Sequence, residues 1–324
     1  MSPNKIARAT INKMINGGYG LCTAENGKTM MVLHGLPGET VEVEIVEQKQ
    51  RVDYGIVRAV LSPHQSRIDP PCPYYATCGG CNLQHADYFT QCSIKDQILQ
   101  DLLKRNQASG LHLLLHLLSP IIPSPEQYGY RQRIRLKTGQ RQRLGFNKFR
   151  SHEIVAVKLC LLAPQHINSA LEYLQKSSRF HSLFPHVEEI EILSNPGDNS
   201  LCLVLYLTRK PRPADRKVAN TLAMEMSPDT RVFFAGRQFS MEGPFSRQEH
   251  THERCLQMNL PGKIPITLFW EAGGFCQVNI KQNVNLVDCV LEFSDPSTSD
   301  TILDLYCGMG NFALPLALHA KHVH

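Results

Sequence analysis

Three cysteines lie within ten residues in the stretch "CPYYATCGGCNLQH", residues 72–85. Cys72, Cys78 and Cys81 form a C-x5-C-x2-C pattern, and the two intervening glycines allow the backbone to turn tightly beside a bulky site. Thiolates at this spacing are typical ligands of zinc or of an iron–sulfur cluster. His85 could be the fourth ligand of a zinc ion, whereas an iron–sulfur cluster would favour a fourth cysteine. The spacing alone does not choose between the two metals.

Cys160 is the best candidate for a fourth cysteine ligand. It ends a predicted strand in "EIVAVKLCLLAP", residues 153–164, and precedes a proline that can begin a helix. A disulfide is the weaker alternative, because the chain has 11 cysteines and its opening residues lack the apolar stretch of a secretory signal. We therefore expect a reducing, cytoplasmic setting, where a cysteine cluster more often binds a metal or takes part in catalysis.

The composition is that of a globular protein, with 42% hydrophobic and 19% charged residues. The formal net charge of +5 permits a polyanionic partner without requiring one. The most apolar run, residues 111–123, is too short for a membrane span and is interrupted by two histidines and two prolines. We expect buried chain there, no membrane contact, and a monomer.

A dense run of basic residues, "RQRIRLKTGQRQRLGFNKFR", occupies residues 131–150. It holds eight of the 34 basic residues of the chain and no acid. Cations at period two predict a strand with one cationic face, while Ile134 and Leu136 occupy the other face. Such a hairpin matches an RNA or DNA phosphate backbone, although a solvated surface hairpin is the plainer alternative. The candidate RNA-binding residues are Arg131, Arg133, Arg135, Lys137, Arg141 and Arg143.

A glycine-rich turn lies in "ILDLYCGMGNFALPLA", residues 302–317. An apolar strand ends in an acid, a G-x-G turn follows, and a helix begins after it. Ligands bind at such turns because the backbone approaches closely and N–H groups point outward. The third glycine of a dinucleotide-binding turn is missing, since Asn311 and Phe312 follow Gly310. The pattern D-x-x-C-G-x-G-N-F resembles motif I of S-adenosylmethionine-dependent methyltransferases.

Several groups of elements must position these residues. Residues 5–61 contain short strands and turns that suggest a small barrel. A proline-rich connector, residues 62–73, leads into the cysteines, and a helix is predicted over 86–106. Residues 125–240 alternate strands and helices, as in an α/β or α+β domain. From residue 263 the pattern changes to what resembles the first β-loop-α unit of a doubly wound sheet.

Taken together, four segments resemble the RNA (uracil-5)-methyltransferase family, and most closely its 23S ribosomal RNA branch. They are the TRAM-like residues 5–61, "CPYYATCGGCNLQH", "YRQRIRL" with "LGF" and "SHEIVAVKLC", and "FCQVN" with "DLYCGMGNF". The resemblance implies a multidomain fold. Its expected parts are a TRAM/OB-like β-barrel over 1–62, an α/β central domain with an iron–sulfur cluster over 63–90 and 124–262, and the start of a Rossmann-like methyltransferase domain over 91–123 and 263–324.

The resemblance also implies cofactors and a reaction. A 4Fe–4S cluster would be held by Cys72, Cys78, Cys81 and Cys160, which leaves His85 as a structural residue. S-adenosylmethionine would contact Gln277, Tyr306 and Asn311. The implied reaction is methylation of uridine at C5 in RNA, with 23S rRNA as the expected substrate. An enzyme thiolate adds to C6 of the extruded uracil, C5 attacks the sulfonium methyl, and a general base removes the C5 proton.

No catalytic residue is assigned within the chain. In the family the nucleophilic cysteine and the base lie well past motif I, so we expect them beyond His324 and expect this chain to be inactive alone. Cys276 and Cys307 are poor substitutes, because neither has a basic neighbour that would lower its thiol pKa. Two alternatives stay open: a non-catalytic RNA-binding iron–sulfur protein, and a zinc-containing RNA-binding protein.

Overall fold

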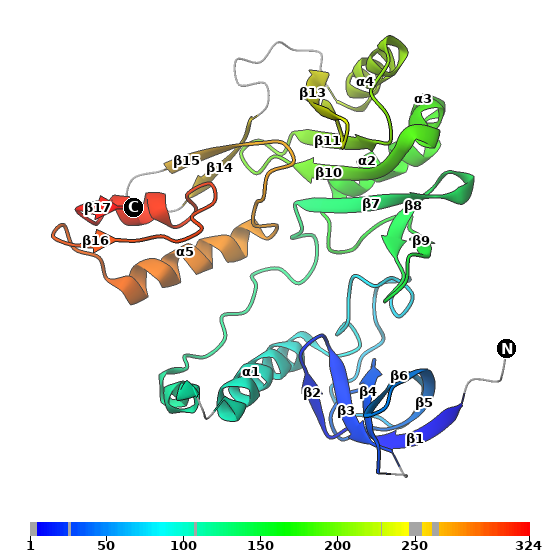
Figure 1. Cartoon of the computed structure of the whole chain (residues 1–324), viewed down its shortest axis with the longest axis vertical. Helices are drawn as coiled ribbons and strands as arrows, with labels where there is room; N and C mark the ends of the chain where they lie inside the picture. The colour runs from blue at the N-terminus through cyan, green and yellow to red at the C-terminus, as the bar shows by residue number, and fades with distance from the viewer. Residues whose placement is uncertain (1–4, 25–26, 107–108, 228, 246–254, 261–265) are drawn as a thin grey trace. The chain divides into compact units, whose positions relative to one another are not determined.

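The structure is a computed structural model that describes residues 5–24, 27–106, 109–227, 229–245, 255–260 and 266–324 (Figure 1). The chain forms two compact units. The first contains residues 1–123 together with 148–151, and the second contains 124–147 and 152–324. The predicted division into three parts, whose boundary at 262/263 lies outside the described residues, stays a prediction.

The first unit is built on a six-stranded sheet with the order β1-β5-β6-β4-β3-β2. Its strands are β1 (Ile6–Thr10), β2 (Lys13–Ile15), β3 (Tyr19–Thr23), β4 (Thr29–Leu33), β5 (Thr40–Gln48) and β6 (Val52–Ser62). Alternation of apolar and acidic residues along β5 buries Val41 and Val43 completely. These valines join Ile11, Met30 and Val32 in the core of the unit. The strands predicted over 5–61 are confirmed.

A tight turn over Leu36–Glu39 links β4 to β5. Gly38 has a φ of +84°, and the Glu39 N–H donates to the Leu36 carbonyl at 3.1 Å. A glycine is suited to that position because it adopts positive φ without steric cost. The turn buries Leu36, which packs with Met14, Ala86 and Ile94.

Helix α1 (Tyr88–Arg105) confirms the helix predicted after the cysteines. It begins where the Asp87 carboxylate accepts the Thr90 N–H at 2.7 Å, and basic residues occupy its last turn. Ile94 is buried, but Leu102, eight residues later, is 46% exposed. The 3-10 helix η2 (Leu111–Leu117) follows, and four of its five leucines are exposed rather than buried as expected.

The second unit is built on a seven-stranded sheet with the order β13-β12-β11-β10-β7-β8-β9. Its strands are β7 (Arg133–Gly139), β8 (Arg143–Asn147), β9 (Ile154–Ala156), β10 (Val187–Ser194), β11 (Leu201–Leu207), β12 (Arg231–Gly236) and β13 (Phe239–Phe245). Within this sheet, only β11 and β12 pair in parallel. Helix α4 (Pro213–Met226) connects them, as a parallel crossover requires.

Helices and a hairpin accompany this sheet. Helix α2 (Gln165–Lys176) buries Ile167, Leu171 and Leu174 at the spacing of one helix face. The remaining elements before α4 are α3 (Ser178–Leu183), η3 (Gln140–Gln142) and η4 (Phe184–His186). Val204 and Phe233 of the sheet share a core with Leu256 and Trp270 of the hairpin β14 (Cys255–Leu260) and β15 (Ile266–Glu271), and with α5 (Ile280–Ser294).

The last described elements are short. They are β16 (Thr301–Ile302), α6 (Ala313–Ala317) and β17 (His322–Val323), and β16 pairs with β17 in parallel. This confirms a strand, a glycine turn and a helix in the predicted order, although the strand and helix are shorter than expected. No helix in the described ranges has the length and hydropathy to cross a bilayer.

Candidate cofactor and RNA-binding sites

The loop that carries three of the cysteines is a series of turns. The Tyr75 N–H donates to the Cys72 carbonyl at 3.0 Å, and the Cys78 N–H donates to the Tyr74 carbonyl at 2.8 Å. Cys72, Cys78 and Cys81 are all partly buried. A Cβ atom on Gly80 would lie 3.6 Å from the Cys78 sulfur, so the glycine leaves room beside that thiol.

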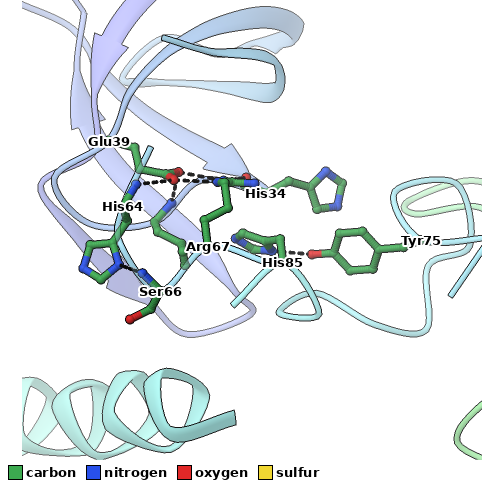
Figure 2. Close-up of polar contacts among 8 residues, drawn as sticks. His34, Glu39, His64, Ser66, Arg67, Tyr75 and His85 are labelled. Atoms are coloured by element: carbon green, nitrogen blue, oxygen red, sulfur yellow. Dashed lines mark hydrogen bonds and ion pairs between the residues drawn. The ribbon is translucent and has the colours of Figure 1, made fainter. Parts of the chain in front are cut away.

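A buried carboxylate ties the connector before this loop to the first sheet (Figure 2). Glu39 is completely buried and accepts from the backbone N–H groups of Leu36 at 2.8 Å and His64 at 3.0 Å. Arg67 adds a bidentate contact, with Nε at 2.5 Å and Nη2 at 2.6 Å from the two carboxylate oxygens. These contacts hold the pKa of Glu39 below its usual value despite burial.

His85 is buried beside this ion pair and faces Tyr75 (Figure 2). The Tyr75 hydroxyl lies 2.5 Å from His85 Nδ1 and donates to the Asn82 carbonyl at 2.9 Å. Burial, with the charge of Arg67 nearby, lowers the pKa of His85 to about 4. His34 packs against the Tyr75 ring, and its pKa is lowered in the same way, to about 4. The contact of the ring with Tyr75 supports the structural role expected of His85, which stays a prediction.

Cys160 belongs to the second unit, where its backbone is fixed by one amide side chain. Asn168 Oδ1 accepts the Cys160 N–H at 2.8 Å, and Asn168 Nδ2 donates to the carbonyls of Cys160 and Ala163, both at 3.1 Å. Four thiols suit an iron–sulfur cluster chemically. No three His, Cys, Asp or Glu side chains in the described part of the chain are grouped to hold a metal, so the cluster stays a prediction.

The predicted cationic strand is β7, but its cations meet acids from the neighbouring strand. β10 pairs with β7 so that Glu189 lies opposite Lys137 and Glu191 lies opposite Arg135. Glu189 pairs with Arg135 and Lys137. Glu191, whose side chain is 1% exposed, receives Arg133 at 2.6 Å. The run 131–150 contains no acid of its own, yet a strand about fifty residues later neutralises much of its face.

The remaining predicted RNA-binding residues lie at the ends of this strand and on its partner. Arg131 forms an isolated backbone bridge with Asn279, ahead of β7. Arg141 lies in η3, at the turn, and Arg143 begins β8 with an exposed side chain. The hairpin is therefore confirmed as a structure, while its contact with RNA stays a prediction.

The glycine turn after β16 has the open backbone that a ligand requires. Gly308 and Gly310 have φ of +57° and +86°, and a Cβ atom on Gly308 would meet nothing within 4 Å. Tyr306 is fully exposed at 103% and also has positive φ, +63°. The Asp304 Oδ2 atom is buried without a partner in the described structure. This unsatisfied acceptor beside an open glycine turn fits a bound ligand with an amino group.

Asn311 is more enclosed than the sequence suggested. It is 7% exposed and exchanges two hydrogen bonds with Asn283 of α5, one at 2.8 Å and one at 3.0 Å. Its amide therefore fastens the glycine turn to α5. Any contact with a cofactor must use its remaining donor or its backbone.

Gln277 lies on the loop of residues 272–279, between β15 and α5. Its side chain is half-buried, whereas Cys276 beside it is 3% exposed. Burial raises the pKa of the Cys276 thiol, even though Arg133 lies close by. A raised thiol pKa argues against Cys276 as a nucleophile, as expected from the sequence.

Four residues at these candidate sites were not predicted from the sequence: Asp304, Asn283, Glu191 and Asn168. An acid at the end of an apolar strand was the available signal for Asp304. The other three act through pairings with distant residues, which no local pattern reveals.

Comparison with known proteins decides the family. A family model described as tRNA (Uracil-5-)-methyltransferase matches residues 88–324. The chain belongs to this family. Family members are methyltransferases, so the expectation of an enzyme is confirmed and the non-catalytic alternative is not favoured.

Curated uracil-5-methyltransferases align with nearly the whole chain. The 23S rRNA (uracil(1939)-C(5))-methyltransferase RlmD of Pectobacterium atrosepticum is 31% identical over 99% of this chain and 68% of its own length. The protein of the same name from Vibrio parahaemolyticus is 30% identical over 97% of this chain and 68% of its own length. The chain thus spans about two thirds of these relatives, and the resemblance to the 23S rRNA branch is confirmed.

A solved uracil-5-methyltransferase shares the fold. The crystal structure of Pyrococcus abyssi tRNA (uracil-54, C5)-methyltransferase in complex with S-adenosyl-L-homocysteine has a TM-score of 0.65 and 19% identity. The matched region covers 95% of this chain and 70% of the Pyrococcus abyssi chain. The multi-sheet α/β fold is therefore confirmed, whereas the closed barrel and the iron–sulfur cluster stay predictions.

Proposed function

We propose that this chain provides the RNA-binding and cofactor-binding parts of an enzyme that methylates uridine at C5 in 23S rRNA, in the cytoplasm. The observation that carries the proposal is the alignment of 99% of the chain, at 31% identity, with a 23S rRNA (uracil(1939)-C(5))-methyltransferase. The open glycine turn with the buried, unpartnered Asp304 carboxylate oxygen supports a cofactor site within that alignment.

S-adenosylmethionine would supply an electrophilic methyl group on a sulfonium. Gly308 lets the cofactor approach the backbone, since the space above its Cα is open. Asp304 Oδ2 can accept a hydrogen bond from the cofactor's amino group. The Gln277 amide can bond the carboxylate or amine of the methionine part, and the exposed Tyr306 ring can cover the cofactor. Asn311 holds the turn in place through Asn283.

RNA contact is assigned to the basic hairpin. Arg131 and Arg143 are stronger candidates than Arg135 and Lys137, which already pair with Glu189, and Arg141 stays a candidate from the sequence. Arg135 and Lys137 share the single carboxylate of Glu189, so the three side chains together keep a net positive charge. Arg135 and Lys137 can therefore still contribute to the electrostatic field that attracts phosphate. Binding should weaken steeply with salt.

We also propose that Cys72, Cys78, Cys81 and Cys160 hold a 4Fe–4S cluster with a structural role. The donor set supports this, because three thiols share one loop and the backbone of the fourth is fixed by Asn168. Iron and labile sulfide in anaerobically purified protein, and their loss in the Cys160→Ser variant, would support the cluster. Zinc without labile sulfide would contradict the cluster and support a zinc site instead.

In the proposed chemistry, addition of a thiolate to C6 of uracil would make C5 nucleophilic, and the cofactor would supply the methyl group to C5. Loss of the C5 proton to a base, with expulsion of the thiolate from C6, would then give 5-methyluridine and the free enzyme. The proposal assigns the nucleophile to none of the cysteines in these 324 residues. Cys276 is buried with a raised pKa. Cys307 is exposed on the glycine turn.

The reaction is tested with S-adenosylmethionine labelled in its methyl group and a 23S rRNA transcript. Digestion of the RNA to nucleosides should place the label in 5-methyluridine when the enzyme is supplied from its native source. This chain alone should bind the RNA without transferring label. Label in cytidine, adenosine or a ribose would contradict the assignment, and label transferred by the chain alone would contradict the absence of a nucleophile.

A further inference from the structure

Arg133 differs from the other cations of the basic hairpin because its side chain points into the second unit. Its side chain is 18% exposed, and it pairs with Glu191, whose side chain is 1% exposed. Its other terminal nitrogen, Nη1, donates to the carbonyl of Gly274 at 2.7 Å. Arg135, two residues later on the same strand, is 49% exposed and lies over the Tyr206 ring. The predicted RNA-binding role therefore fits Arg133 poorly.

The Gly274 carbonyl belongs to the 272–279 loop, which carries Gln277. Arg133 also lies within hydrogen-bonding range of the buried Cys276 thiol in that loop. Further contacts run along the same two segments. The Gln132 N–H donates to the Val278 carbonyl at 2.8 Å, and Arg131 forms a backbone bridge with Asn279. Residues 131–133 thus hold the loop at several points, and Arg133 supplies the side-chain contact.

We infer that Arg133 is a positioning residue, which fixes the 272–279 loop through its bond to Gly274 while Glu191 fixes the guanidinium. The planar guanidinium presents several N–H donors in a rigid fork, so one side chain can bond the carboxylate and the loop carbonyl together. A lysine has a single point of charge and serves such divergent acceptors less well. The assignment of Gln277 to S-adenosylmethionine rests on the proposed function; the holding of the loop does not.

The chain contains one tryptophan, which reports on this loop directly. Trp270 is the next-to-last residue of β15 and is 7% exposed, and its Cδ1 lies 3.4 Å from where a Cβ of Gly274 would be. Displacement of the loop would let water reach the indole and shift its emission to longer wavelength. Cys276 gives a second report, because its alkylation requires the loop to open.

The test compares three variants of the chain. Arg133→Met/Glu191→Leu removes both partners of the buried ion pair, so no buried charge is left unpaired and the fold should be retained. Arg133→Lys keeps the charge and serves as the second variant if the double substitution fails to fold. Arg143→Met is the matched control, since it removes the same charge from an exposed position on the same hairpin.

The double variant should keep the urea midpoint of the parent. Its Cys276 should be alkylated about tenfold faster, as judged by peptide mapping, because one charge-assisted hydrogen bond to the loop is lost. Its tryptophan emission should shift to the red, and its affinity for S-adenosylhomocysteine should fall about tenfold. Arg133→Lys should show smaller changes in the same direction, and Arg143→Met should show no change in alkylation, emission or affinity.

Parent-like alkylation of Cys276 and parent-like emission in the double variant would overturn the inference, because the pair would then be only a stabilising contact. If the double variant does not fold, parent-like alkylation and parent-like emission in Arg133→Lys would overturn the inference. A third outcome is faster alkylation of the double variant while even the parent chain does not bind S-adenosylhomocysteine. This outcome would support the role of Arg133 in fixing the loop and would count against the proposed cofactor role of Gln277.

Discussion

Replacement of Glu39 by alanine should destabilise the first unit strongly. The carboxylate is completely buried and accepts four N–H groups, two from backbone and two from Arg67. Glu39→Ala leaves the guanidinium of Arg67 without its counter-ion and the buried Leu36 N–H without an acceptor. Glu39→Gln keeps the shape and one carbonyl oxygen but turns an NH2 group toward donors.

The expected cost follows from these contacts. Breaking a buried ion pair costs about 3–5 kcal/mol, and the Arg67 side chain is 21% exposed, which favours the lower end. A buried N–H without an acceptor adds about 1–3 kcal/mol. We expect a loss of roughly 4–5 kcal/mol for Glu39→Ala and about half of that for Glu39→Gln. With a urea dependence of about 2 kcal/mol per molar, the midpoint should fall by about 2 M.

Far-UV circular dichroism follows the whole chain, whereas the single tryptophan lies in the second unit. The circular dichroism transition should move and the tryptophan transition should stay. Glu47→Ala is the control, because Glu47 is 43% exposed and pairs with Lys49 and Arg150 at 3.2 Å, which is worth about 0–1 kcal/mol. A shift for Glu39→Ala no larger than that of the control would refute the reasoning.

Other predictions concern acid, the glycine turn and RNA. Because burial lowers the pKa of His34 and His85 to about 4, the stability they contribute is full above pH 6.5 and is lost as the pH falls toward 4. Urea midpoints of the first unit that stay constant between about pH 7 and about pH 4.5 would contradict this. Asn283→Leu and Asn311→Leu should show a coupling energy of about 1–2 kcal/mol in a double-mutant cycle of unfolding, and strict additivity would count against the amide pair. Arg143→Ala should reduce the slope of log affinity for RNA against log salt by about 0.7–0.9, and an unchanged slope would exclude a phosphate contact.

Local pattern was sufficient for most elements of the second unit. The alternation of strands and helices predicted over 125–240 matches the elements from β7 to β12, and the period-two cations with Ile134 and Leu136 between them predicted β7. The glycine turn with an acid before it is present between β16 and α6 as predicted, and its cofactor role stays a proposal. These features depend on neighbours a few residues apart, which is the range over which sequence periodicity carries information.

What the sequence could not provide was pairing between distant segments. The run 131–150 has no acid within it, so its cations appeared available for RNA. β10 then places Glu189 and Glu191 across from β7, and Arg133 turns inward to a loop some 140 residues later. Asn311 likewise meets Asn283, 28 residues away, in a buried pair. Register and burial decide such contacts, and both follow only from the folded chain.

We propose that this chain belongs to an enzyme that makes 5-methyluridine in 23S rRNA. Deletion of the encoding gene from the native source, followed by nucleoside mass spectrometry of purified 23S rRNA and transfer RNA, tests this proposal. We expect 5-methyluridine to be lost from 23S rRNA and restored by the gene, with transfer RNA unchanged. Unchanged 5-methyluridine in 23S rRNA, or loss from transfer RNA alone, would contradict it.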